Sequence, residues 1–373
     1  LDANTTNNYH TAVGYNALTA NTTGEVNTAV GGRALDANTT GYANVAIGYD
    51  AMGAATTGDR CVGVGAYALD AALTGNDNTA VGNEAGSSVT SGANNTAVGG
   101  YALRNTTTAS YNTALGSESL ETNTTGAYNT AVGYRALEGN TTGASNIAIG
   151  YNALKDNTTT NQNVAVGNNA LQSNTAAANV AIGADALTNN TTGTANVSVG
   201  TYALDANTTG ADNTAVGKDA LSANTTASGN TAVGSAALLA SDGDNNTAVG
   251  RIALTANTTG TNNAAFGRSN LYSNTTGANN SAFGMGALGA NTTGGNNTAV
   301  GYNALDANTT TSGSTAVGYQ ALSANTTGSS NVALGMNALL VSTTGSSNTA
   351  VGSYALDANT DGGNNTAVGY DAG

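Results

Sequence analysis

Branched or aromatic apolar residues that are followed directly by glycine recur along the whole chain at a nearly constant spacing. Consecutive copies lie 17 residues apart, and the intervals from Val166 to Ile182 and from Val233 to Val249 are one residue shorter. The unit reads Asn-Thr-Ala-Val-Gly-Tyr-x-Ala-Leu-x-Ala-Asn-Thr-Thr-Gly-x-x. The apolar members of this internal repeat are Val13, Val30, Ile47, Val64, Val81, Val98, Leu115, Val132, Ile149, Val166, Ile182, Val199, Val216, Val233, Val249, Phe266, Phe283, Val300, Val317, Leu334, Val351 and Val368.

A repeat of 17 residues is too short for a helical hairpin and matches one coil of a β-solenoid. Asn, Thr and Gly are abundant, and all three have low helix propensity. The Thr-Ala-Val stretch predicts a short strand, and the glycine after it permits a tight corner. Ala-Leu predicts a second short strand, and Asn-Thr-Thr-Gly predicts a turn. The sequence thus predicts an all-β parallel β-solenoid of 22 rungs, with residues 1–373 as a single repetitive segment.

The residue types found at each slot of the repeat predict which side chains point inward. The slot before the strand alanine holds Thr, Val, Ile, Ala or Ser, and the slot after it holds Val, Ile, Leu or Phe. The slot five residues later is mostly Leu. We expect these three columns to form the core. Only Gly63 and Ser198 replace the strand alanine, so we expect that slot to face a packed surface with no room beyond Cβ.

An asparagine precedes nearly every predicted strand, and only His10, Cys61 and Ser314 replace it. At a rung spacing of about 4.8 Å, amides can hydrogen-bond along such a column and form an Asn ladder. The alternative is that each asparagine caps its own turn. We favour the ladder, and we expect Cys61 to be a buried substitute for asparagine.

Composition and charge argue against two classes of partner, nucleic acids and the membrane interior. Charged residues make up 8% of the 373 residues, and the net charge is −14. Eight Lys and Arg in total are too few to neutralise a nucleic-acid backbone, so no nucleic-acid partner is expected. No run approaches the ~20 consecutive apolar residues that span a membrane, so no membrane insertion is expected. Leu1 in place of an initiator Met suggests a piece of a longer fibre.

The strand segments Asn44–Gly48, Asn146–Gly150 and Asn179–Gly183 resemble the head repeats of trimeric autotransporter adhesins of the YadA type. The fuller unit, Asn297–Leu305, is similar to repeats of bacterial and phage tail-fibre-domain proteins. The resemblance covers the whole chain, although the period here is longer by the Asn-Thr-Thr-Gly insertion. It implies a left-handed, extracellular β-roll or solenoid in a fibre or an adhesin stalk.

One rung buries too little apolar surface to fold alone, because ordering its 17 residues costs on the order of 25 kcal/mol. We therefore expect self-association, either as a homo-oligomer or as an end-to-end filament. The resemblance to the adhesin heads makes a trimer one candidate for the oligomer.

Asn-x-Thr is a glycan acceptor sequence in secreted chains, and it recurs in the turn of most repeats. Stacked turns would then carry a column of covalent glycans along one edge. The alternative is that Asn-Thr-Thr-Gly is simply a favourable turn. The candidate acceptors are Asn4, Asn21, Asn38, Asn123, Asn140, Asn157, Asn190, Asn207, Asn224, Asn257, Asn274, Asn291, Asn308 and Asn325, with Asn105 one position early.

Three successive repeats lack the turn asparagine, and the leucine column is interrupted in the same region. One interpretation is an apolar contact patch for a neighbouring chain, and the other is sequence drift. The candidate patch consists of Ala55, Ala72, Leu73 and Val89.

No arrangement of residues predicts catalysis. His10 and Cys61 are the only histidine and cysteine and lie three repeats apart, and the carboxylates are scattered. We therefore predict no catalytic, cofactor-binding or metal site, no cofactor and no enzymatic activity. The leading hypothesis is the rigid shaft of an extracellular fibre, filament or adhesin stalk, on a cell-surface appendage or a virion. The alternative is a ligand-binding solenoid with a carbohydrate- or ice-binding surface.

Overall fold

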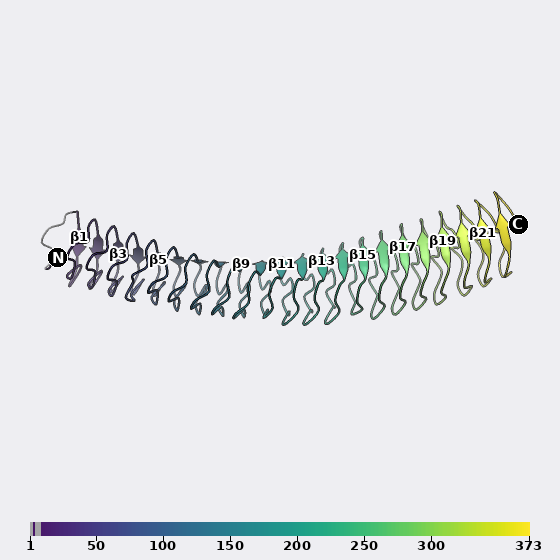
Figure 1. The fold of residues 1–373 in the computed structure, drawn as a ribbon. Helices are drawn as coiled ribbons and strands as arrows, with labels where there is room; N and C mark the ends of the chain where they lie inside the picture. Colours follow the sequence, from purple (N-terminus) through teal and green to yellow (C-terminus); the bar gives the residue numbers. More distant parts are fainter. Residues whose placement is uncertain (1–2, 4–8) are drawn as a thin grey trace. The chain divides into compact units, whose positions relative to one another are not determined.

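The computed structural model describes Ala3 and residues 9–373. The chain divides into two compact units, Leu1–Thr191 and Thr192–Gly373. In each unit a three-residue strand recurs once per repeat, and strands are the only regular elements in the described part of the chain. Figure 1 shows each unit as a succession of similar coils. Each unit is therefore a parallel β-solenoid, and the two units hold 22 rungs, which confirms the predicted fold class.

The first unit contains the strands of the first eleven described rungs. They are β1 (Thr11–Val13), β2 (Thr28–Val30), β3 (Val45–Ile47), β4 (Val62–Val64), β5 (Thr79–Val81), β6 (Thr96–Val98), β7 (Thr113–Leu115), β8 (Thr130–Val132), β9 (Ile147–Ile149), β10 (Val164–Val166) and β11 (Val180–Ile182).

The second unit repeats this arrangement with eleven further strands. They are β12 (Val197–Val199), β13 (Thr214–Val216), β14 (Thr231–Val233), β15 (Thr247–Val249), β16 (Ala264–Phe266), β17 (Ser281–Phe283), β18 (Thr298–Val300), β19 (Thr315–Val317), β20 (Val332–Leu334), β21 (Thr349–Val351) and β22 (Thr366–Val368).

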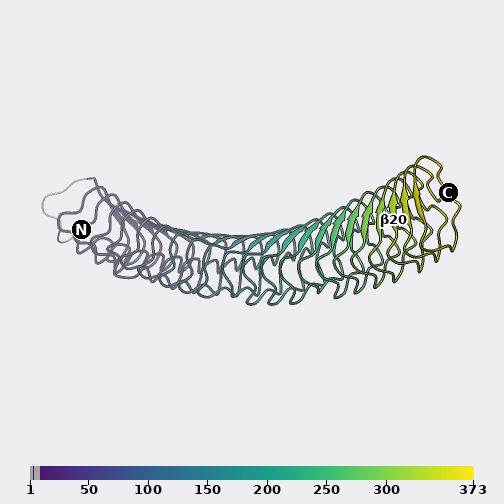
Figure 2. The same ribbon diagram turned by 45° about the vertical axis from the view of Figure 1, so that its right-hand side comes forward.

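Within each unit the repeat sets the register of the sheet. Ala29 of β2 lies opposite Ala46 of β3, one repeat further along the chain. A repeat that is one residue shorter keeps this register, because Ala165 of β10 still pairs with Ala181 of β11. The strands consequently lie side by side along one wall of the coils (Figure 2). Among the described residues, no helix has the length and apolar character that crossing a bilayer requires.

The interior of each coil is narrow and is filled by small side chains and one leucine. Ala29, Leu35 and Asn38 are 0% exposed, and their equivalents are buried in nearly every rung. Thr28 and Val30, on either side of the strand alanine, are only partly buried. The predicted core is therefore correct for the leucine column and wrong for the Thr and Val columns, which form the outer face of the strands.

The reason lies in the alternation of a strand, which sends neighbouring side chains to opposite faces. Only a side chain as small as that of Ala or Ser fits between the strand and the leucine that faces it, so the branched residues point outward. The prediction of a strand-alanine slot with no room beyond Cβ is confirmed, since Ala46, Ala148 and Ala299 are 0% exposed.

The corner after each strand requires glycine. Gly82 has φ +140°, and a Cβ on it would lie 2.5 Å from the carbonyl oxygen of Gly99 in the next rung. The Ala-Leu segment that follows is a series of turns, so the predicted second strand is wrong. Arg135 and Leu137 adopt φ values of 58° and 53°, outside the range of a strand. The Leu137 amide nevertheless donates to Ala153 O in the next rung at 3.0 Å.

Two departures from the repeat compensate for one another inside the first unit. Met52 takes a leucine slot, and Gly63 takes the strand-alanine slot of the following rung. A Cβ on Gly63 would lie 2.8 Å from Met52 Cγ. Similarly, Gly86 takes a leucine slot, and Val89 Cγ2 lies 3.6 Å from the place where a Cβ on Gly86 would be. Met52 fills the space that Gly63 leaves, and Val89 together with Leu69, whose Cδ2 lies 3.0 Å from that Cβ position, fills the space at Gly86.

This pairing predicts a double-mutant cycle. Gly63→Ala is expected to destabilise the chain by about 1–3 kcal/mol, because its methyl group overpacks against Met52. Met52→Leu combined with Gly63→Ala restores the ordinary Leu–Ala pairing and should recover at least the wild-type stability. Urea unfolding of the four proteins measures the coupling. Additive effects of the two substitutions would contradict the compensation.

Candidate functional site

Two columns of buried asparagines hold successive coils together. In the column before the strands, Asn27 Oδ1 accepts a hydrogen bond from the Asn44 amide at 2.9 Å, and Asn27 Nδ2 donates to Gly41 O at 2.8 Å. Asn95 Nδ2 also donates to Asn78 Oδ1 at 3.0 Å. This strand ladder confirms the prediction of an Asn ladder. Cys61, the buried substitute, keeps the link because its amide donates to Asn44 Oδ1 at 2.8 Å.

The turn asparagines form a second ladder, which the sequence did not predict. Asn140 Nδ2 donates to Asn123 Oδ1 at 2.9 Å and to Gly143 O at 3.0 Å, and Asn157 Nδ2 donates to Asn140 Oδ1 at 3.0 Å. The signal was present in the sequence as a constant asparagine column. The same asparagines also belong to Asn-x-Thr acceptor sequences, so the sequence alone did not distinguish a buried ladder from a column of glycan acceptors.

The turn ladder buries most of the candidate glycan acceptors. A glycan on a buried amide would require the ladder to open, so the structure favours the alternative of a plain turn. Asn105 is exposed, because Thr106 takes the ladder slot in its rung. Asn4 lies outside the described residues. The acceptors that are 0% exposed are Asn21, Asn38, Asn123, Asn140, Asn157, Asn190, Asn207, Asn224, Asn257, Asn274, Asn291, Asn308 and Asn325.

Three of the four residues of the candidate contact patch are buried inside the coil. Ala55, Leu73 and Val89 are at most 1% exposed and take the place of asparagines inside the turn ladder. Only Ala72 is exposed. Three successive rungs therefore replace hydrogen-bonded amides by apolar packing within the coil, without offering an apolar surface to another chain.

The outer face of the strands is an uncharged surface that extends along each unit. Every outward slot of the 22 described strands holds Thr, Val, Ile, Leu, Ala, Ser or Phe. Ile149 in the first unit is 40% exposed and Val317 in the second is 38% exposed. Phe266 and Phe283 stack on this face with ring centroids 4.9 Å apart. We call this surface the strand face.

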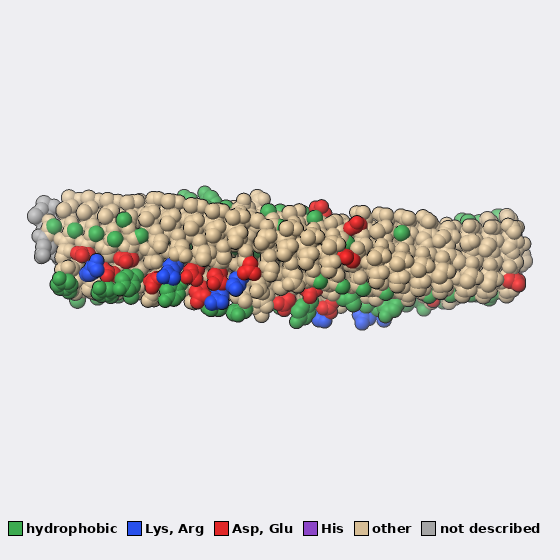
Figure 3. Space-filling model, turned by 90° about the horizontal axis from the view of Figure 1, so that it is seen from below, with side chains coloured by type: hydrophobic (Ala, Val, Ile, Leu, Met, Phe, Trp, Pro, Cys, Tyr) green, Lys and Arg blue, Asp and Glu red, His purple; other side chains and the backbone are tan. Residues whose placement is uncertain are grey.

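Charged side chains gather away from the strand face. Over the first unit they lie along one edge beside exposed hydrophobic groups, as the red and blue atoms of Figure 3 show. One carboxylate oxygen from each of Glu118, Glu121 and Glu138 lies within 4.8 Å of the other two. Arg135 Nε lies 2.6 Å from Glu118, Lys155 Nζ lies 3.8 Å from Glu138, and Arg104 also pairs with Glu121. These cations compensate the carboxylates, so the cluster is an ion-pair network.

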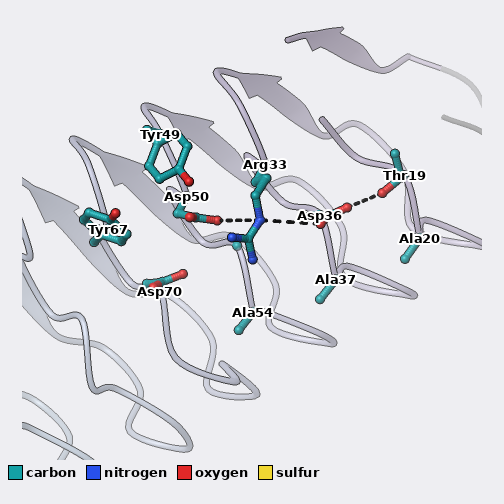
Figure 4. A pocket seen from close by; sticks show the side chains of 11 residues that line it. Thr19, Ala20, Arg33, Asp36, Ala37, Tyr49, Asp50, Ala54, Tyr67 and Asp70 are labelled. Atoms are coloured by element: carbon teal, nitrogen blue, oxygen red, sulfur yellow. Dashed lines mark hydrogen bonds and ion pairs between the residues drawn. The ribbon is translucent and has the colours of Figure 1, made fainter. Parts of the chain in front are cut away.

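A groove of about 720 Å³ opens on the first unit at the slot that follows each leucine. Gly53 takes this slot between Asp36 and Asp70, and the missing side chain hollows the surface there. Figure 4 shows the two tyrosines of the groove nearer the strands and three alanines nearer the turns. We call this the Gly53 groove; it is lined by Thr19, Ala20, Arg33, Asp36, Ala37, Tyr49, Asp50, Gly53, Ala54, Tyr67 and Asp70.

Arg33 lies at the centre of the Gly53 groove. Its Nε is 3.2 Å from Asp50 Oδ1 and 4.0 Å from Asp36 Oδ2, and Asp36 also accepts a hydrogen bond from Thr19 Oγ1. Asp50 is only 4% exposed, and its Oδ1 receives no hydrogen bond of good geometry despite the ion pair. The groove therefore holds three carboxylates and one guanidinium, and Asp50 is buried against that guanidinium.

Burial raises the pKa of the Asp70 carboxyl above its ordinary value, and the charge of Asp50 adds to this shift. The Asp50 carboxylate is also the main reason why the pKa of Arg33 is raised. The carboxyl group of Asp70 is thus partly desolvated at the wall of the groove, where a hydrogen-bonding ligand can reach it.

The second unit carries a smaller cavity of about 390 Å³, which shares with the Gly53 groove a glycine and the aspartate one repeat later. Gly289 takes the slot after the leucine, Tyr272 precedes it in this column and Asp306 follows it. Burial raises the pKa of Asp306 as well. We call this the Gly289 pit; it is lined by Ile252, Ser269, Tyr272, Ser273, Gly286, Gly289, Ala290 and Asp306. A glycine followed by an aspartate one repeat later was the sequence signal for both cavities.

Comparison with protein-family models and with curated proteins gives no match to this chain. The resemblance to tail-fibre and adhesin repeats stays a prediction.

The turn ladder predicts that replacing two asparagines of the same Asn-x-Thr motif by alanine has very different effects on the free energy of unfolding. Asn140→Ala removes three hydrogen bonds and takes the Asn140 amide donor away from the buried Asn123 Oδ1, while Gly143 O and the Asn157 amide each keep one other partner. We therefore expect a loss of about 2–4 kcal/mol. Asn105→Ala, at an exposed position, should change stability by less than about 0.5 kcal/mol. Urea unfolding compares the two variants. Equal effects would mean that Asn140 is not part of a buried ladder.

The shifted pKa of Asp70 predicts a dependence of stability on pH. Because its folded pKa is raised, the ionised carboxylate destabilises the fold at neutral pH, and this penalty disappears as the pH falls below the unfolded value of about 3.9. Asp70→Asn should therefore stabilise its rung at pH 7, by less than about 1 kcal/mol because solvent screens the partly exposed group. Native-state hydrogen exchange at pH 7 and pH 3.5 measures the gain, and a gain equal at both pH values would contradict this reasoning.

Proposed function

We propose that this chain is a non-catalytic structural segment, a rigid shaft of an extracellular fibre, filament or adhesin stalk. The observation that supports this most is the continuity of the coil. Each described unit repeats one backbone path through eleven rungs, and the same asparagine columns link successive rungs. A fold of this kind extends in one direction by adding rungs and keeps the same cross-section. The extracellular location, on a cell-surface appendage or a virion, rests on the resemblance of the repeats alone.

The shaft associates laterally with further copies through the strand face. At about 4.8 Å per strand and 3.3 Å per residue, the strand face of one unit is roughly 50 Å long and 10 Å wide. Two such faces in contact bury on the order of 1,000 Å² in total, which reaches the lower limit for a specific interface. The strand face holds no charge, so the net charge of −14 does not oppose this contact directly.

The proposed contact between two copies is the packing of one strand face against another. Sheets that pack face to face lie about 10 Å apart, and rows of Thr and Val can interdigitate across them. A homo-oligomer, with the trimer as one form, leaves the charged edge at the outside of the assembly. Covalent glycans are not required for the shaft, since the buried turn asparagines already serve as ladder groups.

The experiment is electron microscopy and sedimentation of the full chain, with a substitution on the strand face. Ile147→Lys combined with Ile149→Lys places two charges at outward positions of β9, which are each 40% exposed. We expect the wild-type chain to form laterally associated rods and this variant to remain as single rods. Tyr128→Lys, at a position that is 63% exposed, is the matched control and should associate as the wild type does.

Because the proposed contact is apolar, association should persist at 1 M NaCl, where the Debye length is about 3 Å. A wild-type chain that stays monomeric would contradict lateral association. If such a monomer also lowered the freezing point of water in a thermal-hysteresis assay, the regular Thr and Val rows would favour an ice-binding surface in place of the shaft.

A further inference from the structure

We propose that the Gly53 groove and the Gly289 pit are binding sites for neutral saccharides. This inference is independent of the shaft function, because both cavities lie on columns that take no part in the ladders or the strand face.

The cavities exist because of the missing side chains of two glycines. A Cβ on Gly53 would lie 2.8 Å from Asp50 Oδ1 and 3.0 Å from Asp70 Oδ1. A Cβ on Gly289 would lie 2.5 Å from Asp306 Oδ1. Neither glycine has the positive φ that excludes other residues. The absence of a side chain at these positions therefore creates space beside a carboxylate and does not serve a backbone requirement.

The charged groups of the Gly53 groove select a neutral ligand with many hydroxyl groups. Asp36, Asp50 and Asp70 repel an anion, and the Arg33 guanidinium lies where a cation would have to approach the same carboxylates. Sugar hydroxyls can donate to carboxylate oxygens and accept from a guanidinium at the same time. Asp50 Oδ1 is buried against Arg33 at 3.2 Å, so the carboxylates that such a ligand can reach are those of the less buried Asp36 and Asp70.

Aromatic side chains supply the second element of a saccharide site. Tyr49 and Tyr67 are 52% and 40% exposed, and their rings lie edge to face with centroids 5.6 Å apart. An aromatic ring offers an apolar surface to the C–H face of a sugar and a hydroxyl to its polar edge. In the Gly289 pit the exposed ring is that of Tyr272, which is 46% exposed and comes from the slot after the leucine, not from the corner.

The Gly53 groove is elongated, so it suits a linear ligand. A further cavity of about 300 Å³ shares Tyr67 and Asp70 with it and continues to Glu84 and Ser87. Together they follow one column from Thr19 to Ser87, which is four rung steps or roughly 19 Å at the strand spacing. This length suits a short oligosaccharide that lies along the coils.

A glycine and an aspartate one repeat later form a cavity in the second unit as well, which argues against random sequence drift as the origin of the Gly53 groove. Each cavity combines a glycine in the slot after the leucine position, which Met52 holds before Gly53, with an aspartate one repeat later. Each also has an exposed tyrosine, supplied by the corner in the first cavity (Tyr49) and by the slot after the leucine in the second (Tyr272). In both cavities burial raises the pKa of that aspartate. Each site therefore retains a partly desolvated carboxylate that hydrogen bonds from a ligand would stabilise.

Isothermal titration calorimetry of the full chain against cellohexaose, chitohexaose and maltohexaose tests the proposal. We expect saturable binding of at least one of these neutral oligosaccharides, with two sites per chain. Gly53→Ala should remove one of the sites, and Gly53→Ala combined with Gly289→Ala should lower the association constant at least about tenfold. Tyr67→Ala, which does not fill the cavity, should weaken binding at the first site to a similar extent.

Two variants serve as matched controls. Gly100→Ala adds a methyl group whose nearest neighbour is Ser117 Oγ at 4.0 Å, so binding should be unchanged. Asp357→Asn changes an aspartate in the same slot as Asp70 and Asp306, but its column neighbour in the preceding rung is Leu340 and no glycine. It should bind as the wild type does. Sedimentation of every variant separates a loss of binding from a loss of assembly.

The proposal is overturned if none of the three oligosaccharides binds at 10 mM, or if the double glycine variant binds as tightly as the wild type. It is also overturned if oligogalacturonate or CaCl₂ binds at these residues in preference to the neutral sugars. In that case the cavities recognise charge. Circular dichroism confirms that each variant is folded before its binding is interpreted.

Discussion

The narrow interior of the coil is the constraint on which the rest of this structure depends. Between the strand and the opposite wall there is space for one leucine, two alanines and two asparagine amides in each rung. The apolar area that such a rung buries is small, so hydrogen bonds between rungs contribute a large share of the stability of the stacked coils. The two asparagine ladders satisfy the turn carbonyls and the strand amides that a narrow coil leaves inside.

The repeat predicts the fold class and the strand positions, because period and register are direct properties of the sequence. It does not predict which face of a three-residue strand is inside, since Thr-Ala-Val alternates in the same way in both cases. We expected the large branched residues inside, as in most β proteins, and the opposite holds for Thr28 and Val30. The restriction of the middle slot to alanine carried the correct information, because the tightest space tolerates the fewest residue types.

The turn ladder illustrates a second limit of sequence reasoning. Asn-Thr-Thr has two physical meanings, as an exposed glycan acceptor and as a buried amide column. Only the position of the amide in three dimensions separates them, and Asn140 and Asn105 show the two outcomes in the same motif. The replacement of Asn by Ala55 and Val89 was consistent with burial, since an apolar residue tolerated in place of an amide points to an interior slot.

The distribution of variation also explains how a uniform coil can carry local sites. Inward slots are fixed by the width of the coil, whereas the slot after the leucine accepts Thr19, Asp36, Gly53 and Asp70 in successive rungs without a change in the backbone path. Corner glycines such as Gly82 serve conformation, because their φ near 140° excludes other residues. Gly53 and Gly289, in contrast, leave open space beside a carboxylate because they have no side chain. Corner glycines and turn glycines such as Gly41, whose Cβ would lie 2.4 Å from Gly58 O, recur because the backbone requires them. Gly53 and Gly289 occur in single rungs and give one part of the coil a property that its neighbours lack.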